Sequence, residues 1–169
     1  KYNLPVIEDG AQSFGAQFKN RKSCSLTTIG TTSFFPSKPL GCYGDGGACF
    51  TNDQKLADKM RAIKNHGGVK RFNHQYIGMN ARLDTLQASV LIQKLKYFNE
   101  TISQRNVCAE YYTSKIHSSG LDKFIKTPVV NDGCLSVWAQ YSLLARNKTE
   151  RDQIVDFLKQ NNINVLIKY

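Results

Sequence analysis

Short strand-like runs dominate the first third of the chain. Three runs rich in β-branched and aromatic residues predict strands, over residues 1–9, 28–35 and 48–50. The first run ends at Asp9 and continues into Gly10-Ala11-Gln12. An apolar run that ends in an acid and small residues is typical of a parallel strand whose carboxyl end opens onto a loop.

Helical spacing follows after residue 50. Apolar residues recur on one face between residues 56 and 63, behind a Thr51–Gln54 segment that fits a capping box. Residues 65–68 carry the asparagine and glycines that commonly end a helix. Residues 66–82 have no clear period and predict a long loop. Spacings of three and four then predict one amphipathic helix over residues 84 to about 116.

The last part of the chain mixes the two patterns. Residues 124–130 and 136–144 predict strands, and residues 163–169 predict a final one. Between them, a cap at residues 149–152 predicts a helix that ends near Gln160. Two strands, a helix and a strand in this order predict a small α+β layer.

Composition narrows the class of protein. The chain has 169 residues, of which 41% are hydrophobic and 21% charged, as in ordinary globular proteins. No apolar run approaches the ~20 residues of a membrane span, and we expect neither a signal peptide nor a membrane partner. The five cysteines form no CxxC pair. Reduced thiols in a cytoplasmic protein without a metal site are therefore expected.

The formal net charge of +10 raises the question of nucleic-acid binding. Lysines and arginines are however scattered, without a block of five like charges and without an aromatic-and-basic motif. We therefore interpret the basic residues mainly as solvated surface and expect no nucleic-acid partner.

Residues 31–47 form the most distinctive stretch. They hold one lysine, Lys38, between Pro36 and Pro39, and four glycines follow. The prolines fix backbone φ and remove donors, so this stretch is neither a helix interior nor a central strand. The neutral amine of a lysine on such a stiff, partly apolar loop attacks carbonyl groups. An ordinary surface lysine on a turn is the alternative that this stretch leaves open.

Asp9 and Lys38 follow two successive predicted strands. In open α/β sheets, ligands bind outside the carboxyl ends of the strands, so these two residues could meet one ligand. Pyridoxal phosphate uses such a pair, because a lysine holds its aldehyde as a Schiff base and an aspartate keeps its ring nitrogen protonated.

Four ordered motifs carry a resemblance to a known family: Val6–Ser13, Ser33–Gly41, Gly44–Ala48 and Ile77–Asp84. Together they resemble the DegT/DnrJ/EryC1/StrS family of aminotransferases, which use pyridoxal phosphate and act on keto-sugars carried by nucleotides. The resemblance covers essentially the whole chain. Within the family, three further segments are most similar to members that aminate a 3-keto UDP-sugar uronate: Cys42-Tyr43, His74 and Ser136–Tyr141.

The resemblance implies an α/β fold of the aspartate aminotransferase-like type (fold type I). Residues 1–100 would be the C-terminal part of the large cofactor-binding domain, and residues 101–169 most of a small α+β domain. Family members carry more chain before and after these parts, so we expect a truncated chain. The full-length protein would be a homodimer.

The resemblance also assigns the catalytic and cofactor residues. Lys38 would hold the cofactor and then act as the general base and acid, and Asp9 would pair with the ring nitrogen. Gln12 would reach the phenolic oxygen or ring face, Ser33 the phosphate, and Asn80 the phosphate across the dimer. A lysine at position 38 argues against the family's dehydratase branch, which has histidine there.

Three residues match positions near the sugar: Ser37, Arg82 and Tyr169. The forked guanidinium of Arg82 suits a uronate or a phosphate. Lys168 departs from the family, in which a histidine often precedes this tyrosine. Gly10 stands where many members carry alanine.

The leading hypothesis is therefore an enzyme that moves an amino group, from glutamate as the expected donor, onto a nucleotide-linked keto-sugar for surface polysaccharide or lipopolysaccharide synthesis. Part of the basic surface would attract the substrate's diphosphate. A 4-keto acceptor is the alternative among enzymes. A folded fragment without catalytic activity is the alternative from another class, and we expect residues 1–169 alone to be inactive.

Overall fold

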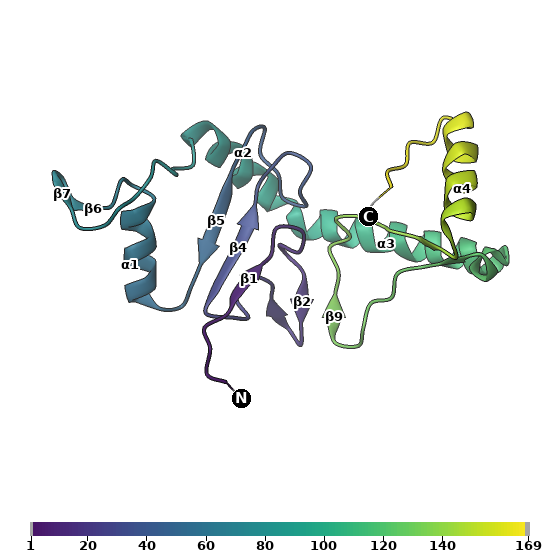
Figure 1. Cartoon of the computed structure of the whole chain (residues 1–169), viewed down its shortest axis with the longest axis horizontal. Helices are drawn as coiled ribbons and strands as arrows, with labels where there is room; N and C mark the ends of the chain where they lie inside the picture. The colour runs from purple at the N-terminus through teal and green to yellow at the C-terminus, as the bar shows by residue number, and fades with distance from the viewer. Residues whose placement is uncertain (1, 168–169) are drawn as a thin grey trace. The chain divides into compact units, whose positions relative to one another are not determined.

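A computed structural model describes residues 2–167 of the protein. They divide into two compact units (Figure 1). One unit comprises the chain up to Val107 together with Val130–Ala139, and the other comprises Cys108–Val129 and the chain from Gln140 onwards. The predicted domains, residues 1–100 and 101–169, stay a prediction about a longer protein.

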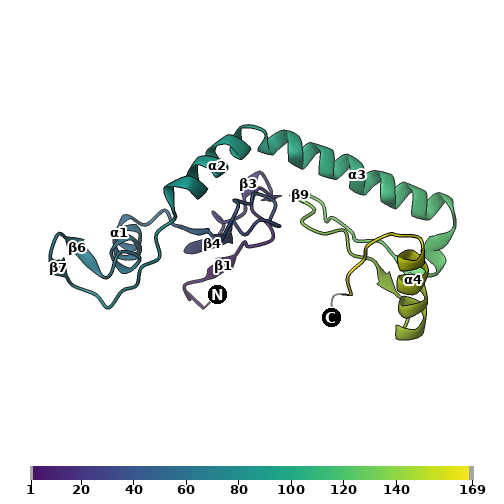
Figure 2. The same cartoon turned by 90° about the horizontal axis from the view of Figure 1, so that it is seen from above.

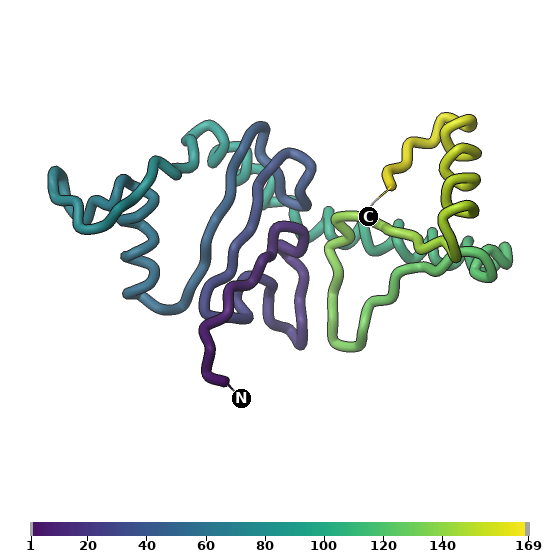
Figure 3. The backbone as a smooth tube through the Cα atoms, in the orientation of Figure 1, coloured from purple at the N-terminus to yellow at the C-terminus, as the bar shows by residue number. Residues whose placement is uncertain are grey.

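The first unit contains a three-stranded sheet in the order β1-β4-β5 (Figure 1). β1 is Ile7–Asp9, β4 is Ile29–Ser33 and β5 is Gly47–Phe50. β1 pairs with β4 in parallel, and β4 pairs with β5 antiparallel. The three strands predicted in the first third of the chain are thus present, each within or close to its apolar run. Figure 3 follows the backbone from β4 through a loop into β5.

A second sheet of the same unit has the order β3-β2-β9. β2 (Gln17–Phe18) and β3 (Arg21–Lys22) form a hairpin, and β9 (Cys134–Leu135) pairs antiparallel with β2. The two turn residues Lys19 and Asn20 have φ of 48° and 63°. Positive φ at both positions gives a two-residue turn whose twist matches that of the strands.

The core of this unit lies between the β1-β4-β5 sheet, the loop after β4 and the helices that follow. Its buried members are Phe34, Leu40, Cys42, Leu91, Phe98, Ile102 and Val137. Phe14 joins them through rings stacked on Phe50 and Phe98, with centroids 5.9 and 5.8 Å away. The apolar spacing read from the sequence therefore includes genuine core positions.

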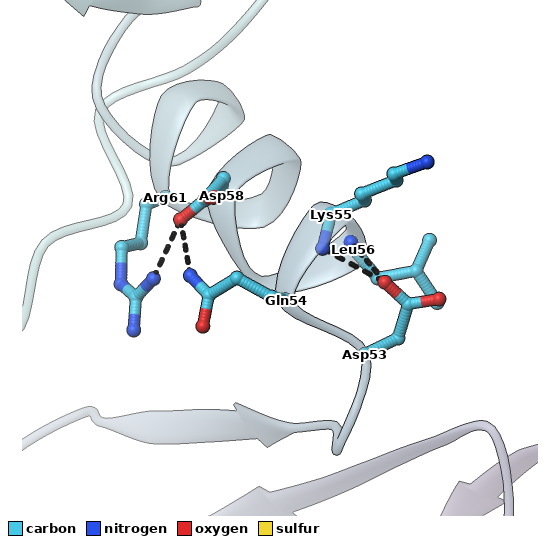
Figure 4. A network of polar contacts seen from close by, with 6 residues as sticks. All are labelled: Asp53, Gln54, Lys55, Leu56, Asp58 and Arg61. Carbon is cyan, nitrogen blue, oxygen red and sulfur yellow. Dashed lines mark hydrogen bonds and ion pairs between the residues drawn. The ribbon is translucent and has the colours of Figure 1, made fainter.

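Helix α1 (Gln54–Ile63) begins one residue after Asp53, which is its N-cap. Asp53 Oδ1 accepts hydrogen bonds from the backbone N–H groups of Lys55 and Leu56, at 2.8 and 3.1 Å (Figure 4). The capping box predicted for Thr51–Gln54 was therefore wrong in its position. The Thr51 hydroxyl instead accepts from Asp53 N at 3.2 Å, one step before the helix.

The segment predicted as a loop over residues 66–82 contains a short hairpin. β6 (Gly68–Lys70) pairs antiparallel with β7 (Asn73–His74). The loop prediction was wrong for these residues because backbone pairing across so short a turn leaves almost no period in the sequence.

The single helix predicted over residues 84–116 is two helices. α2 spans Thr85–Lys96 and α3 spans Phe98–Ser118. Tyr97 lies between them with φ −105° and ψ 6°, outside helical values. The two axes meet at a bend (Figure 2), which a hydrophobic period cannot reveal because the apolar spacing continues through it.

The second unit contains the C-terminal part of α3, a short 3₁₀ helix η1 (Leu121–Lys123) and two short strands. β8 (Ile125–Lys126) pairs antiparallel with β10 (Leu144–Ala145). Helix α4 (Lys148–Gln160) follows, capped by Asn147, whose Oδ1 accepts from Glu150 N at 2.9 Å. The cap predicted at residues 149–152 was therefore misplaced by two residues.

Two strand predictions near the C-terminus fail. Residues 136–143 are not in strands, and Trp138 adopts a left-handed φ of 46° that interrupts any extended run. The indole Nε1–H of Trp138 donates to Asn106 Oδ1 at 3.0 Å, a tertiary contact that favours this conformation. Residues 163–167 are also not in a strand, and the remainder of that predicted strand lies outside the described residues.

Across residues 2–167, no helix is long and apolar enough to cross a membrane. In the same part of the chain, no group of three or more His, Cys, Asp or Glu side chains could hold a metal ion.

Candidate functional site

The parallel pairing of β1 and β4 defines the candidate site. Asp9, the last residue of β1, pairs with Thr31, and Ser33 ends β4 two residues later. Directly after β1, Gly10 bonds to β4: Gly10 N donates to Thr31 O at 2.7 Å, and Thr32 Oγ1 donates to Gly10 O at 3.1 Å. Both strands therefore end at the same edge of the sheet, where the loops after them carry the predicted functional residues.

Neighbouring acids in β1 point to opposite faces of the sheet, as successive strand residues do. Glu8 Oε1 accepts from Ser23 Oγ at 2.9 Å and from Cys24 N at 2.8 Å, and Oε2 accepts from Leu26 N at 3.3 Å. Glu8 thus anchors the turn after β3. Sequence reasoning gave it no role, although its place beside Asp9 in a strand already sets it on the other face.

Asp9 is exposed and makes one local hydrogen bond. Its Oδ1 accepts from Ala11 N at 3.0 Å. Its Oδ2 has no hydrogen bond or ion pair with any residue from 2 to 167. One carboxylate oxygen thus remains available to a donor outside the chain.

Lys38 lies in a tight loop that closes on itself. Lys38 N donates to Phe35 O at 2.9 Å, and Phe35 N donates to Ser33 Oγ at 3.2 Å. A side chain at Gly41 would lie 2.6 Å from Pro36 O, so only glycine allows this approach. The Lys38 side chain is half-buried, and its Nζ has no hydrogen bond or ion pair among the described residues.

Cys42 closes the base of this loop. It is 0% exposed, its N donates to Phe34 O at 2.8 Å, and its Sγ lies 3.0 Å from both Phe34 O and Gly44 O. Phe34 N in turn donates to Gly46 O at 2.7 Å. The two ends of the lysine loop are therefore joined to each other at a buried point.

Three further predicted residues lie on the same loops. Ser33 Oγ accepts from Phe35 N, so its hydroxyl proton remains available to an acceptor. Gln12 and Ser37 are exposed. Neither of these two side chains bonds to another residue within the described part of the chain.

Asn80 and Arg82 lie elsewhere in the first unit, beside the end of α1. Asn80 forms an isolated backbone bridge with Asn65, and Arg82 Nη1 donates a long hydrogen bond of 3.4 Å to Asn65 Oδ1. Both side chains are exposed. No hydrogen bond between described residues joins them to Asp9 or Lys38. The last predicted site residue, Tyr169, lies outside the described residues.

The thiol of Cys24 lies behind the acidic strand. Burial raises its pKa, the hydrogen bond with Ser23 opposes this, and the negative charges of Glu8 and Asp9 add to the rise. The thiol therefore stays protonated and acts as a packing group.

A separate hollow of about 620 Å³ lies in the first unit, between the β2–β3 hairpin and the helices α2 and α3. Phe14, Lys22, Phe98 and Asn99 are among its lining residues. Neither Asp9 nor Lys38 lines it. The loops at the sheet edge, rather than this hollow, hold the chemistry that the motifs predict.

Comparison with known proteins identifies the family. The profile of the DegT/DnrJ/EryC1/StrS aminotransferase family matches residues 1–169. The chain belongs to this family. The predicted resemblance is thereby confirmed.

A similar relative is UDP-2-acetamido-2-deoxy-3-oxo-D-glucuronate aminotransferase of Pseudomonas aeruginosa, which is 47% identical over 169 residues. The match covers 100% of this chain and 45% of that protein. The chain thus spans less than half the length of this family member.

Solved structures of family members share the fold. A DegT DnrJ EryC1 StrS aminotransferase from Brucella abortus matches with a TM-score of 0.90 and 40% identity, over 98% of this chain and 43% of that one. The enzyme DesV of S. venezuelae, in complex with a ketimine intermediate, matches with a TM-score of 0.89 and 32% identity, over 96% and 42%. The predicted α/β fold of the family's aminotransferases is therefore confirmed.

Proposed function

We propose that the complete protein is a pyridoxal phosphate-dependent aminotransferase that acts on a nucleotide-linked keto-sugar. One observation carries the proposal: Lys38 is half-buried in the loop after β4, its amine has no partner among the described residues, and Asp9 ends the neighbouring parallel strand. An amine in this setting is available to a carbonyl group.

The side chains at this edge fit the proposed cofactor. The free carboxylate oxygen of Asp9 would accept from the ring nitrogen, the Ser33 hydroxyl would donate to the phosphate, and the Lys38 amine would hold the aldehyde. Gln12 would touch the ring or its phenolic oxygen, and Asn80 of a second subunit would bind the phosphate. When bound, pyridoxal phosphate supplies an electron sink for the substrate carbon that carries the amino group.

The chain's own residues would then divide the proton chemistry. Lys38 would take a proton from one carbon and return it to another as general base and acid. Asp9 would accept a hydrogen bond from the ring nitrogen and so favour the protonated form of that nitrogen. The buried Cys42 contacts would hold the Lys38 loop rigid, which limits the positions that the amine can reach.

The proposed acceptor is a 3-keto UDP-sugar uronate, with glutamate as the donor. The 47% identity to a UDP-2-acetamido-2-deoxy-3-oxo-D-glucuronate aminotransferase supports this acceptor. Ser37, Arg82 and Tyr169 would bind the sugar. Arg82 makes only one long hydrogen bond in the described part of the chain, so most of its guanidinium remains free for a carboxylate or phosphate. The product would serve surface polysaccharide or lipopolysaccharide synthesis in the cytoplasm.

A homodimer follows from the same proposal, because Asn80 and Arg82 would serve the site of the second subunit. Exposed apolar side chains near them support a protein partner: Phe72 is 86% and Ile77 99% exposed. Residues 1–100 would belong to the large domain and residues 101–169 to the small one.

Residues 1–169 alone are expected to be inactive. β1 is paired on one side only among the described strands, and its Ile7 is 68% exposed. An apolar residue so exposed on a sheet edge supports the view that the working site needs further chain.

The test uses the complete protein that contains this chain. Incubation with pyridoxal phosphate, borohydride reduction and peptide mass analysis should place the cofactor on Lys38, and Lys38→Ala should abolish the label. Purified 3-keto and 4-keto nucleotide-sugars with glutamate then distinguish the two acceptors. Labelling elsewhere than Lys38, or equal labelling of Lys38→Ala, would contradict the proposal.

A further inference from the structure

Helix α2 contacts the lysine loop through two polar side chains. Lys94 Nζ donates to Gly41 O at 2.7 Å. Gln87 Oε1 accepts from Tyr43 N at 2.8 Å. These residues are about two turns apart on α2, so they project from the same helical face. The helix therefore binds the backbone on both sides of Cys42.

Side-chain packing reinforces both contacts. The Lys94 ammonium lies 5.1 Å from the centre of the Tyr43 ring, within the range of a cation–π interaction. At Gly44, a side chain would come within 3.0 Å of Gln87 Nε2. Tyr43 is 76% exposed, so its ring alone does not bury this segment in the core. The helix thus contacts residues on both sides of the loop's buried anchor, Cys42.

Lys94 and Lys96, the two lysines near the end of α2, make hydrogen bonds to different parts of the molecule. Lys96 Nζ donates to Gln93 Oε1 at 2.7 Å, within α2 itself and exposed to solvent. Lys94 has no acidic partner among residues 2–167, and its charge-assisted hydrogen bond is part-buried. Charge-assisted hydrogen bonds are about twice as strong as neutral ones. Lys94 is thus directed at the loop.

The contacts lie close to Lys38 along a stiff piece of chain. Only Pro39 and Leu40, both buried, separate Lys38 from Gly41. Gly41 in turn packs on Pro36 O, on the other side of Lys38. A shift of Gly41 would therefore move the lysine backbone, because neither proline can absorb a change in φ.

We propose that Lys94 and Gln87 are positioning residues that fix the Lys38 loop for the cofactor. The proposal rests on the proposed function, in which Lys38 holds pyridoxal phosphate. Neither residue touches the amine, so both act through the backbone of residues 41–43.

The experiment measures cofactor binding by the complete protein. Absorbance titration with pyridoxal phosphate gives the Kd of the cofactor. The pH dependence of the cofactor's absorbance band reports changes in the surroundings of the Lys38 amine. For Lys94→Met, we expect Kd to rise roughly ten-fold and the pH profile to shift, from the loss of one charge-assisted hydrogen bond. Lys96→Met is the matched control and should leave both unchanged.

A pair of variants at Gln87 provides the second measurement. Gln87→Glu keeps an oxygen that can accept from Tyr43 N, whereas Gln87→Leu removes it. We expect Gln87→Leu to shift the pH profile and Gln87→Glu to restore a profile near the original. If Lys94→Met does not fold, this pair decides the question.

The outcomes separate the two proposals. Absence of a Lys38 label in the unmodified protein would refute the aminotransferase function itself. A normal label, with Lys94→Met and Gln87→Leu binding the cofactor as Lys96→Met does, would refute only the positioning role.

Discussion

Gly10 is a buried residue whose replacement by alanine tests the packing behind the candidate site. Its φ lies outside the left-handed region, so the backbone itself would accept alanine. The obstacle is space: a Cβ would overlap the Cys24 sulfur and lie 2.9 Å from Thr31 O. Forcing an extra methyl group into a packed site costs about 1–3 kcal/mol. We expect Gly10→Ala to destabilise the protein by this amount.

Cys24 determines whether the methyl group fits. This residue is 4% exposed, and its sulfur fills the space beside Gly10. Cys24→Ala alone should cost about 1 kcal/mol, because it deletes one buried heavy atom. In the double variant the new methyl group replaces the sulfur, so the two effects should couple by at least about 1 kcal/mol. Rescue should be incomplete, because Thr31 O remains in place.

Urea unfolding of the complete protein measures this coupling. Gly10→Ala should lower the urea midpoint without changing the slope of the transition, and the double variant should lower it by less. Cys108→Ala, which removes an exposed thiol, controls for loss of a cysteine. Strictly additive free energies for the two substitutions would refute the steric argument.

Three further results are expected. Asp53→Ala should destabilise the protein by about 1 kcal/mol in thermal unfolding, whereas Asp53→Asn, which keeps an acceptor oxygen, should not. Equal losses of stability in the two variants would argue against Asp53 as the N-cap of α1. The hydrogen bonds from Arg146 lower the pKa of Glu150, so Glu150→Gln should reduce the stability of the protein at neutral pH. The difference in stability between the two proteins should disappear as pH falls below about 4, because Glu150 is then protonated. A difference that persists in acid would exclude this ion pair as its source. Burial raises the pKa of Cys24, so iodoacetamide should label Cys108 before Cys24 at pH 8, and only unfolding or higher pH should equalise the two rates.

Local patterns predicted which strands and loops bring Asp9 and Lys38 to one sheet edge, but they predicted several of the surrounding elements wrongly. Asp9 and Lys38 could be placed at one sheet edge because the parallel arrangement of β1 and β4 follows from two apolar runs that end in loops. The motifs also contained the proline and glycine spacing that closes the lysine loop. Gln87 and Lys94 carried no such signal, because their role depends on which loop α2 packs against.

The errors in the elements have similar physical causes. The bend at Tyr97 leaves the apolar spacing intact, so one helix was predicted where two exist. The extended run at residues 136–144 has strand composition, but the side-chain contacts of Trp138 override that propensity. Both caps were misplaced by two residues, because Thr51 and Thr149 are N-cap residue types that lie close to the observed caps Asp53 and Asn147.

The opposite orientations of Glu8 and Asp9 make β1 intolerant of any change in length. Deleting or inserting one residue before Glu8 would shift the strand register by one residue, so that each of the two acids would point to the opposite face of the sheet. The carboxylate of Glu8, which accepts hydrogen bonds from the turn at residues 23–26, would then face the candidate site, and Asp9 would face the backbone N–H groups of that turn. Single-residue insertions and deletions in β1 should therefore impair the proposed cofactor binding even though both acids remain in the chain.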